Sequence, residues 1–177
     1  MELDLSRLSS IENFLLEIQI KHFDLIIFLP GITNPKKINL QEYIETHFLH
    51  TIILFDRLTQ RFAIDSSCCF IFVSSRAAKY PSFDIYYSAI KSGLSAALKS
   101  LSAKTHPKSR FLSILPGLIT DSGMYWEMPP EIRESHKLRS ANSLLSLDEA
   151  ALAIFEVIQN RHKYANGEML EIGPIYT

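Results

Sequence analysis

The chain has 177 residues, of which 47% are hydrophobic and 21% charged, and its formal net charge is -1. A chain of this length buries roughly 70% of its unfolded surface, so the composition describes a globular domain and excludes general disorder. The small net charge gives no reason to expect nucleic acid or an anionic membrane as a partner. The longest apolar run, residues 25–29, is too short to span a bilayer.

Two features bear on the cellular compartment. The N-terminus carries Glu2 and Asp4 instead of basic residues before an apolar stretch, so it does not resemble a secretory signal. The two cysteines, Cys68 and Cys69, are adjacent, and such neighbours are poor candidates for a structural disulfide. We therefore expect the protein in the reducing cytoplasm.

In chain order, helical and extended patterns alternate. A capping-box spacing at residues 9–12 and an apolar stripe predict a helix, which an apolar run follows at 24–29. A long helical period covers 40–62, an apolar run covers 69–73, and a second long helical period covers 85–104. An apolar run at 111–115, a helix opened by the capping-box spacing at 146–149, and an apolar run at 169–172 complete the pattern.

The four apolar runs lack polar alternation, which predicts strands covered on both faces. Strands that alternate with helices indicate a parallel sheet between two helical layers. The expected fold is therefore α/β, a three-layer, Rossmann-like, doubly wound and mostly parallel sheet in a single domain over residues 1–177. Residues 122–142 have no clear period, and we expect a long loop with one short helix there, as in substrate lids.

Ligands of such sheets bind beyond the carboxyl ends of the strands, so the residues there are the candidates for chemistry. Tyr87 and Lys91 open the helix after the second strand and share one helical face. A cation beside a phenol favours the phenolate, which suits Tyr87 to exchange a proton with a carbonyl or alcohol oxygen. A serine at the end of the preceding strand is placed to hold the same oxygen.

Five short motifs follow one another along the chain. Residues 24–32 form a strand that ends near Gly31, residues 73–78 read Val-Ser-Ser-Arg-Ala-Ala, and Tyr87 and Lys91 form a Tyr-xxx-Lys pair. Residues 116–120 read Pro-Gly-xx-Thr, and residues 166–173 read Asn-Gly-Glu-Met-Leu-Glu-Ile-Gly. In this order and at nearly this spacing, the motifs resemble the short-chain dehydrogenase/reductase (SDR) family from the first residues of the chain to the last.

The resemblance implies an oxidoreductase that acts on a carbonyl or secondary alcohol with NAD or NADP. It assigns Tyr87 as the general acid/base, Lys91 as the group that tunes its pKa and contacts the ribose, and Ser75 as the partner of the oxyanion. Ser74 is the alternative, because Ser75 lies about one residue closer to Tyr87 than the family pattern has it. The residues expected to contact the cofactor are Gly31, Lys91, Pro116, Gly117 and Thr120.

The sequence also departs from the family. The family opens with a Thr-Gly-xxx-Gly-x-Gly turn that receives the cofactor pyrophosphate, and the six glycines of this chain include no such spacing. Residues 1–23 resemble only the end of a third strand and a helix, so the fold is expected to be N-terminally truncated and cofactor binding impaired or absent. His47 stands where the family has an asparagine of its proton relay, and Leu29 and Pro30 replace the family's Asn-Asn-Ala segment.

Two classes of function are compatible with these residues. The first is an SDR-like oxidoreductase for a small-molecule substrate, and the second is a non-catalytic relative that acts as a binding or assembly subunit. No metal site is expected, because His47 and His50 lack a visible third ligand. The adjacent cysteines are interpreted as strand packing.

The sequence further predicts a homo-oligomer, most simply a twofold dimer. In the family the strand at 24–29 is central and pairs with the first strand of the fold. Without that partner its backbone edge is open, with no Lys or Pro inside the run to protect it. Residues 1–8 could cover this edge only as one short strand. The resemblance also implies dimerisation through the long helices at 40–62 and 85–104, whose many apolar positions suffice for a core face and an interface.

Overall fold

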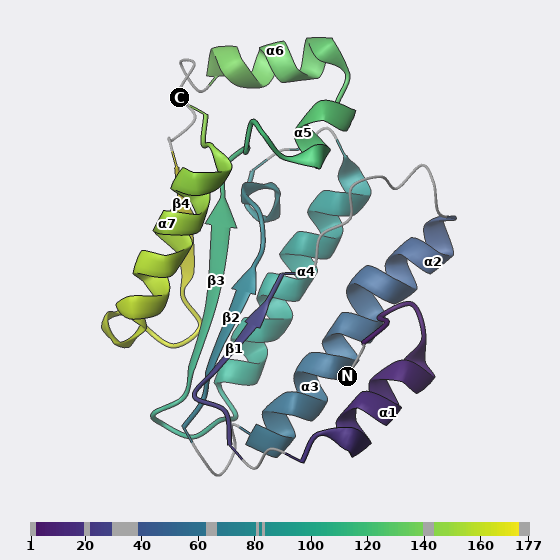
Figure 1. Ribbon diagram of the computed structural model, residues 1–177, viewed down its shortest axis with the longest axis vertical. Helices are drawn as coiled ribbons and strands as arrows, with labels where there is room; N and C mark the ends of the chain where they lie inside the picture. Colours follow the sequence, from purple (N-terminus) through teal and green to yellow (C-terminus); the bar gives the residue numbers. More distant parts are fainter. Residues whose placement is uncertain are drawn as a thin grey trace.

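The computed structural model describes residues 3–19, 22–29, 39–62, 67–80, 82, 84–139 and 144–173. Its sheet has four parallel strands in the order β1-β2-β3-β4 (Figure 1). They are β1 (Leu25–Phe28), β2 (Cys69–Val73), β3 (Arg110–Pro116) and β4 (Met169–Ile172). The α-helices are α1 (Leu8–Glu17), α2 (Leu40–Ile44), α3 (His50–Phe62), α4 (Ile85–Ser102), α5 (Gly123–Glu127), α6 (Pro130–Arg139) and α7 (Leu147–Gln159).

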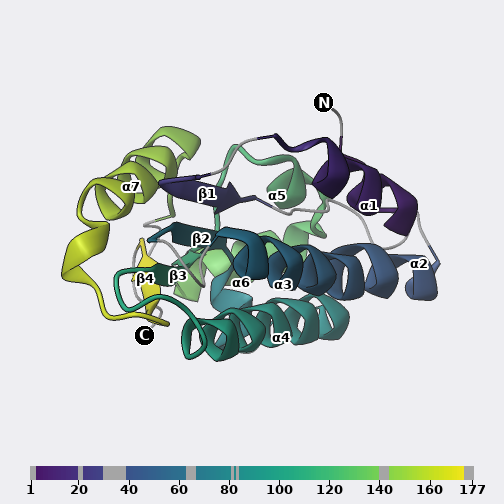
Figure 2. The same cartoon turned by 90° about the horizontal axis from the view of Figure 1, so that it is seen from below.

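Helices cover both faces of the sheet, which confirms the expected α/β layering (Figure 2). One core lies between the sheet and helices α1, α3 and α4, where the rings of Phe70 and Phe111 stack with centroids 4.6 Å apart. The second core lies under α7, where Val157 packs with Ile71 and Ile114. β2 and β3 are buried on both faces, as their continuous apolar sequences predict. Among the helices of the described residues, none is long and apolar enough to cross a membrane.

β1 departs from the prediction that every strand is covered on both faces. Phe28 packs in the core under α3, but Ile27 on the opposite face is 40% exposed. α7 packs against side chains of β2, β3 and β4, and of β1 only Leu25 joins that cluster. β1 is also the edge of the sheet: among the described residues its one neighbouring strand is β2, and residues 3–8 form no strand beside it.

The long helical segment at 40–62 is present, but it is not α-helical throughout. A π-helical turn, η2 (Glu45–Leu49), separates α2 from α3. The Thr51 hydroxyl donates to the carbonyl oxygen of Thr46 at 3.3 Å and so binds a carbonyl inside this wider turn. π-helical turns within α-helices occur frequently at functional sites.

The two predicted capping boxes had different outcomes. At α7 the box is complete, since Ser146 Oγ accepts from Glu149 N and the Glu149 carboxylate accepts from Ser146 N. At α1 the prediction is wrong: the helix begins at Leu8, and Ser10 Oγ instead accepts from the backbone N–H of Asp4. The serine that a box over residues 9–12 would place at the N-cap is Ser9, and it lies inside the first turn because the N-cap is Arg7.

The segment at 122–142 is more regular than a long loop with one short helix. Its described residues contain two helices, α5 and α6, which lie beyond the carboxyl ends of the strands (Figure 1). Ser122 caps α5 by accepting from Tyr125 N at 3.2 Å. α6 is mostly polar, with the sequence PEIRESHKLR, and therefore shows almost no apolar period for a sequence reading to detect. Residues 140–142 lie outside the described residues.

Candidate functional site

The candidate site lies where β2 ends and α4 begins, near the carboxyl edge of the sheet. Asp84 caps α4, and its carboxylate accepts from the backbone N–H groups of Tyr86 and Tyr87 at 3.0 Å each. This cap places Tyr87 in the first turn of the helix and Lys91 one turn further on. The four-residue spacing of Tyr87 and Lys91 therefore places both side chains on the same side of one helix.

A short 3-10 helix, η3 (Arg76–Ala78), carries the end of β2 onto α4. Ser75 is its N-cap and accepts from Ala77 N at 3.1 Å. Ser88 Oγ donates to the Ala77 carbonyl, and Ser92 Oγ donates to the Ala78 carbonyl at 2.9 Å. These side-chain bonds fix the loop that holds Ser75 against the helix that holds Tyr87.

The structure distinguishes the two candidate serines. The side chains of Ser75 and Tyr87 are hydrogen-bonded to each other. Ser74 is buried, and its hydroxyl lies 3.0 Å from Ser95 Oγ and 3.4 Å from the Lys91 carbonyl oxygen. The hydroxyl of Ser75 is therefore the one that meets the phenol, whereas Ser74 binds within the packing of α4.

Lys91 is 5% exposed and lies beside two aromatic rings. Its Nζ is 5.6 Å from the ring centroid of Tyr87 and 5.2 Å from that of Phe72. Burial lowers the pKa of Lys91 to about 8, because the charged form loses its hydration. The ammonium thus lies next to the Tyr87 ring, and its pKa is closer to neutral pH than that of an ordinary lysine.

The pKa of Tyr87 moves against the sequence expectation. Burial raises it, the hydrogen bond with Ser75 lowers it in part, and the carboxylate of Asp84 raises it further. The Lys91 ammonium sits over the face of the ring, and it does not outweigh the burial of the phenol. Burial therefore favours the neutral phenol of Tyr87 over the phenolate.

The residues predicted to contact a cofactor are placed at the neighbouring strand ends. Pro116 is the last residue of β3, and Gly117 N donates to the carbonyl oxygen of Ile172 at 3.0 Å. The backbone N–H and hydroxyl of Thr120 both reach the Leu145 carbonyl, at 2.9 and 3.3 Å. Gly31 and its neighbour Pro30 lie outside the described residues.

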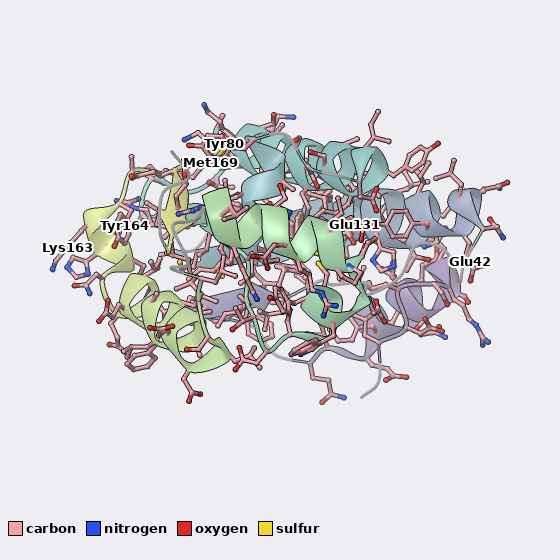
Figure 3. The ribbon with its side chains drawn as sticks, turned by 90° about the horizontal axis from the view of Figure 1, so that it is seen from above. Glu42, Tyr80, Glu131, Lys163, Tyr164 and Met169 are labelled. Carbon is pink, nitrogen blue, oxygen red and sulfur yellow. The ribbon has the colours of Figure 1, made fainter. Side chains whose placement is uncertain are left out.

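Sequence reasoning missed a charged group that joins β2 to β4 at this edge. Arg76 is buried; its Nη2 donates to the carbonyl oxygen of Gly173 at 2.6 Å, and its Nε lies 3.8 Å from the Glu171 carboxylate. Lys79 and Tyr80 bind the same carboxylate at 2.5 and 3.1 Å. Tyr80 lies on the β4 side when the molecule is viewed from above (Figure 3). The sequence signal was weak: Arg76 follows the Ser-Ser pair, and Lys79 comes three residues later.

The histidines and cysteines do not gather into a metal centre. Within the described ranges, no three His, Cys, Asp or Glu side chains come together as a metal ion needs. His50 Nδ1 is 2.8 Å from the carbonyl oxygen of Leu5 instead. Cys68 and Cys69 are both buried and free, and burial raises the pKa of their thiols to about 12 and about 11.

No protein-family model and no curated protein matches the sequence, but solved structures do. A short chain dehydrogenase family protein from Francisella tularensis shares the fold with a TM-score of 0.75 at 17% identity, over 97% of this chain and 78% of that one. A short chain dehydrogenase from Burkholderia cenocepacia in complex with NADP gives 0.76 at 16% identity, over 97% of this chain and 74% of that one.

A 3-ketoacyl-(acyl-carrier-protein) reductase from Brucella melitensis complexed with NADH gives a TM-score of 0.73 at 16% identity, over 96% of this chain and 74% of that one. These likenesses establish that the chain has the fold of short-chain dehydrogenases, as the motifs predicted. The chain spans about three quarters of the length of each of these proteins.

Proposed function

We propose that this chain carries the proton-transfer site of an SDR-like oxidoreductase that acts on a carbonyl or secondary alcohol. The observation that carries the proposal is the Ser75–Tyr87 hydrogen bond with Lys91 beside the Tyr87 ring, at the carboxyl edge of a parallel sheet.

In the reducing direction, each residue has a distinct role. The Tyr87 hydroxyl donates its proton to the carbonyl oxygen of the substrate as negative charge develops there. The Ser75 hydroxyl donates a hydrogen bond to the same oxygen and fixes its position. The Lys91 ammonium stabilises the phenolate that remains on Tyr87. In the oxidising direction, the phenolate takes the proton from the alcohol.

The cofactor of such a reaction would be NAD or NADP, as in the NADH and NADP complexes of the proteins that share the fold. A bound nicotinamide would exchange the hydride. The residues of this chain do not fit a whole dinucleotide, however. The chain contains no glycine-rich pyrophosphate turn, and in the described residues no strand–helix unit lies beyond the β1 edge. We therefore propose that this chain binds the cofactor weakly or not at all.

Nucleotide fluorescence tests this point directly. The chain is titrated with NADH and with NADPH, and the increase in nucleotide emission is followed. We expect no saturation at micromolar concentrations, because backbone N–H groups at a helix N-terminus normally supply much of the pyrophosphate binding. Saturable binding of NADH or NADPH at micromolar concentration would overturn the proposal that cofactor binding is impaired, and it would favour an ordinary oxidoreductase.

The alternative is a non-catalytic SDR-like protein that acts as a binding or assembly subunit. The raised pKa of Tyr87 favours it, because a phenol that ionises less readily is a poorer base for alcohol oxidation. Turnover of any carbonyl with added NADH or NADPH, lost in Tyr87→Phe, would exclude this alternative. Binding of a small molecule without turnover would support it.

We also propose that the protein is a homodimer in the cytoplasm. The edge of β1 that no other described strand occupies can pair with the same edge of a second copy about a twofold axis. Leu29, directly after β1, is an apolar side chain that is 68% exposed. Phe155 on α7 is a second exposed apolar side chain, at 54%. The free thiols of Cys68 and Cys69 agree with a reducing compartment.

A further inference from the structure

The loop that carries Ser75 is held from two sides. On the side of α4, the hydroxyls of Ser88 and Ser92 donate to carbonyl oxygens of η3. On the side of β4, side chains of the loop itself make the contacts. These join residues that are 91 to 97 positions apart in the sequence. The loop is therefore a bridge between the helix of the proposed acid and the last strand of the sheet.

Arg76 is the buried member of the contacts with β4. It is 4% exposed, its Nη2 donates to the carbonyl oxygen of Gly173 at 2.6 Å, and its Nε lies 3.8 Å from the Glu171 carboxylate. Gly173 has a φ of +91°, which glycine adopts readily, and a Cβ there would lie 2.6 Å from Leu145 Cδ1. The glycine thus allows the turn at the end of β4 in which its carbonyl oxygen meets the guanidinium.

The Glu171 carboxylate binds three side chains of the loop. One oxygen accepts from Lys79 Nζ at 2.5 Å and from the Tyr80 hydroxyl at 3.1 Å, and the other faces Arg76 Nε. The hydrogen bond from Lys79 is the largest cause that lowers the pKa of Glu171, so the carboxylate stays ionised. The side chain of Lys79 is 50% exposed and that of Arg76 only 5%. Because exposed ion pairs stabilise little and a buried charge needs its partners, Arg76 is the contact that fixes the loop.

Arg76 also lies against the end of β3. A Cβ built on Gly117 would be 3.5 Å from Arg76 Nη1, and Gly117 N donates to the carbonyl oxygen of Ile172 in β4. The guanidinium therefore lies where the carboxyl ends of β2, β3 and β4 come together. It is directly beside the residue in the chain that meets the Tyr87 phenol.

We propose that Arg76 is a positioning residue that, by tying its loop to the end of β4, holds the Ser75 hydroxyl against the Tyr87 phenol. Arg76 acts through Ser75, its neighbour in the chain, and not on the reacting atoms. Its contribution matters because a hydrogen bond weakens steeply when its angle departs from linearity. This inference rests on the proposed proton-transfer site, but it gives a role to a charged group that the proposed site leaves out.

The contact between Ser75 and Tyr87 can be followed without substrate or nucleotide. The tyrosines are replaced by 3-fluorotyrosine, and the ¹⁹F NMR resonance of Tyr87 is identified by its loss in Tyr87→Phe. We expect Arg76→Met to move this resonance at pH 7 in the same direction as Ser75→Ala, because both changes remove the hydrogen bond at the phenol. A merely structural role of Arg76 would lower the free energy of unfolding and leave the resonance of the folded protein in place. That outcome would overturn the proposal.

A double variant separates positioning from a direct effect of the guanidinium charge on the Tyr87 ring. If Arg76 acts through Ser75, then Arg76→Met causes little further movement of the resonance once Ser75→Ala is present. If the charge acts on the ring directly, Arg76→Met moves the resonance by the same amount in both backgrounds. Equal movements would therefore contradict the positioning role.

Glu171→Gln keeps the test decisive where Arg76→Met does not fold. The amide oxygen can still accept from Lys79 and Tyr80, while the negative charge that faces Arg76 is removed. We expect a smaller movement of the Tyr87 resonance in the same direction, because the bond to the β4 carbonyl remains. A folded Glu171→Gln with the wild-type resonance would also overturn the proposal.

Arg161→Met is the matched control. Arg161 Nη1 likewise donates to a backbone carbonyl oxygen, that of Ile158 at 3.0 Å, but it does so after α7, at the amino edge of the sheet. This variant should leave the Tyr87 resonance unchanged. A movement as large as that of Arg76→Met would show a general loosening of the fold and would defeat the inference. Because no experiment here uses turnover, failure to bind NADH leaves these outcomes intact, and the two proposals fail separately.

Discussion

At the scale of single residues, Tyr87 is the side chain on which the proposed chemistry depends. Its hydroxyl bonds Ser75, and its ring contacts Lys91. We expect Tyr87→Phe to abolish any carbonyl turnover, because the proton donor is removed while the ring is kept. The free energy of unfolding should change by only about 1 kcal/mol, the usual contribution of one hydrogen bond. Denaturant unfolding measured alongside turnover separates these effects, and a fully active variant would remove Tyr87 from the mechanism.

Lys91 carries a stability cost that depends on pH. Its pKa falls from the ordinary 10.5 to about 8 on folding, so between these values the unfolded chain binds more protons than the folded one. Stability from this group therefore rises as the pH passes from about 8 to 10.5. We expect Lys91→Met to be more stable than the wild type at pH 7, by an amount on the order of 3 kcal/mol.

The quantity to measure is the difference in the free energy of unfolding between Lys91→Met and the wild type, because the pH dependence that comes from all other groups is the same in both and cancels. It should shrink as the pH rises through this window, in urea unfolding curves at matched ionic strength. A variant that is less stable than the wild type at pH 7 would show that contacts of the ammonium outweigh its desolvation.

At the scale of elements, the close contact between η2 and α4 depends on Gly93. Alanine is favoured over glycine in a helix by about 1 kcal/mol, but overpacking costs about 1–3 kcal/mol. The Cβ would meet the Phe48 ring at 2.5 Å, so we expect the steric cost to prevail and Gly93→Ala to be destabilised. The double variant Phe48→Leu, Gly93→Ala should be less destabilised than the two single changes add up to, and strict additivity would contradict this contact.

Elements with a strong apolar period were predictable, and those specified by local polar contacts were not. β2 and β4 have the predicted bounds, and the capping box at Ser146 formed as expected. The box at residues 9–12 did not form because the helix begins earlier, at Leu8 with Arg7 as its N-cap, so that Ser9 lies inside the first turn. The π-helical turn inside 40–62 was also invisible, since a one-residue widening leaves the apolar pattern almost unchanged.

At the scale of the whole molecule, the candidate site was predictable to the extent that it lies on one element. Tyr87 and Lys91 share α4, so their spacing alone placed them together. The sequence favoured Ser75 and left Ser74 as the alternative, and only the fold shows that the Ser74 hydroxyl lies against Ser95 of α4 whereas that of Ser75 meets Tyr87. The Arg76–Glu171 contact joins residues far apart in sequence and could not be read from local pattern.

The open edge of β1 leads to the last prediction. The strand pairs only with β2 among the described strands, and Ile27 is 40% exposed on the face that α7 leaves uncovered. Lysine near a strand edge opposes pairing with another chain by charge repulsion and by hydration. We expect the wild type to be a dimer in light scattering at micromolar concentration and Ile27→Lys to be a monomer of about 20.2 kDa. Leu138→Lys, which changes a 69% exposed leucine on α6, is the matched control and should remain dimeric. A monomeric wild type would show that the edge is protected within the chain itself.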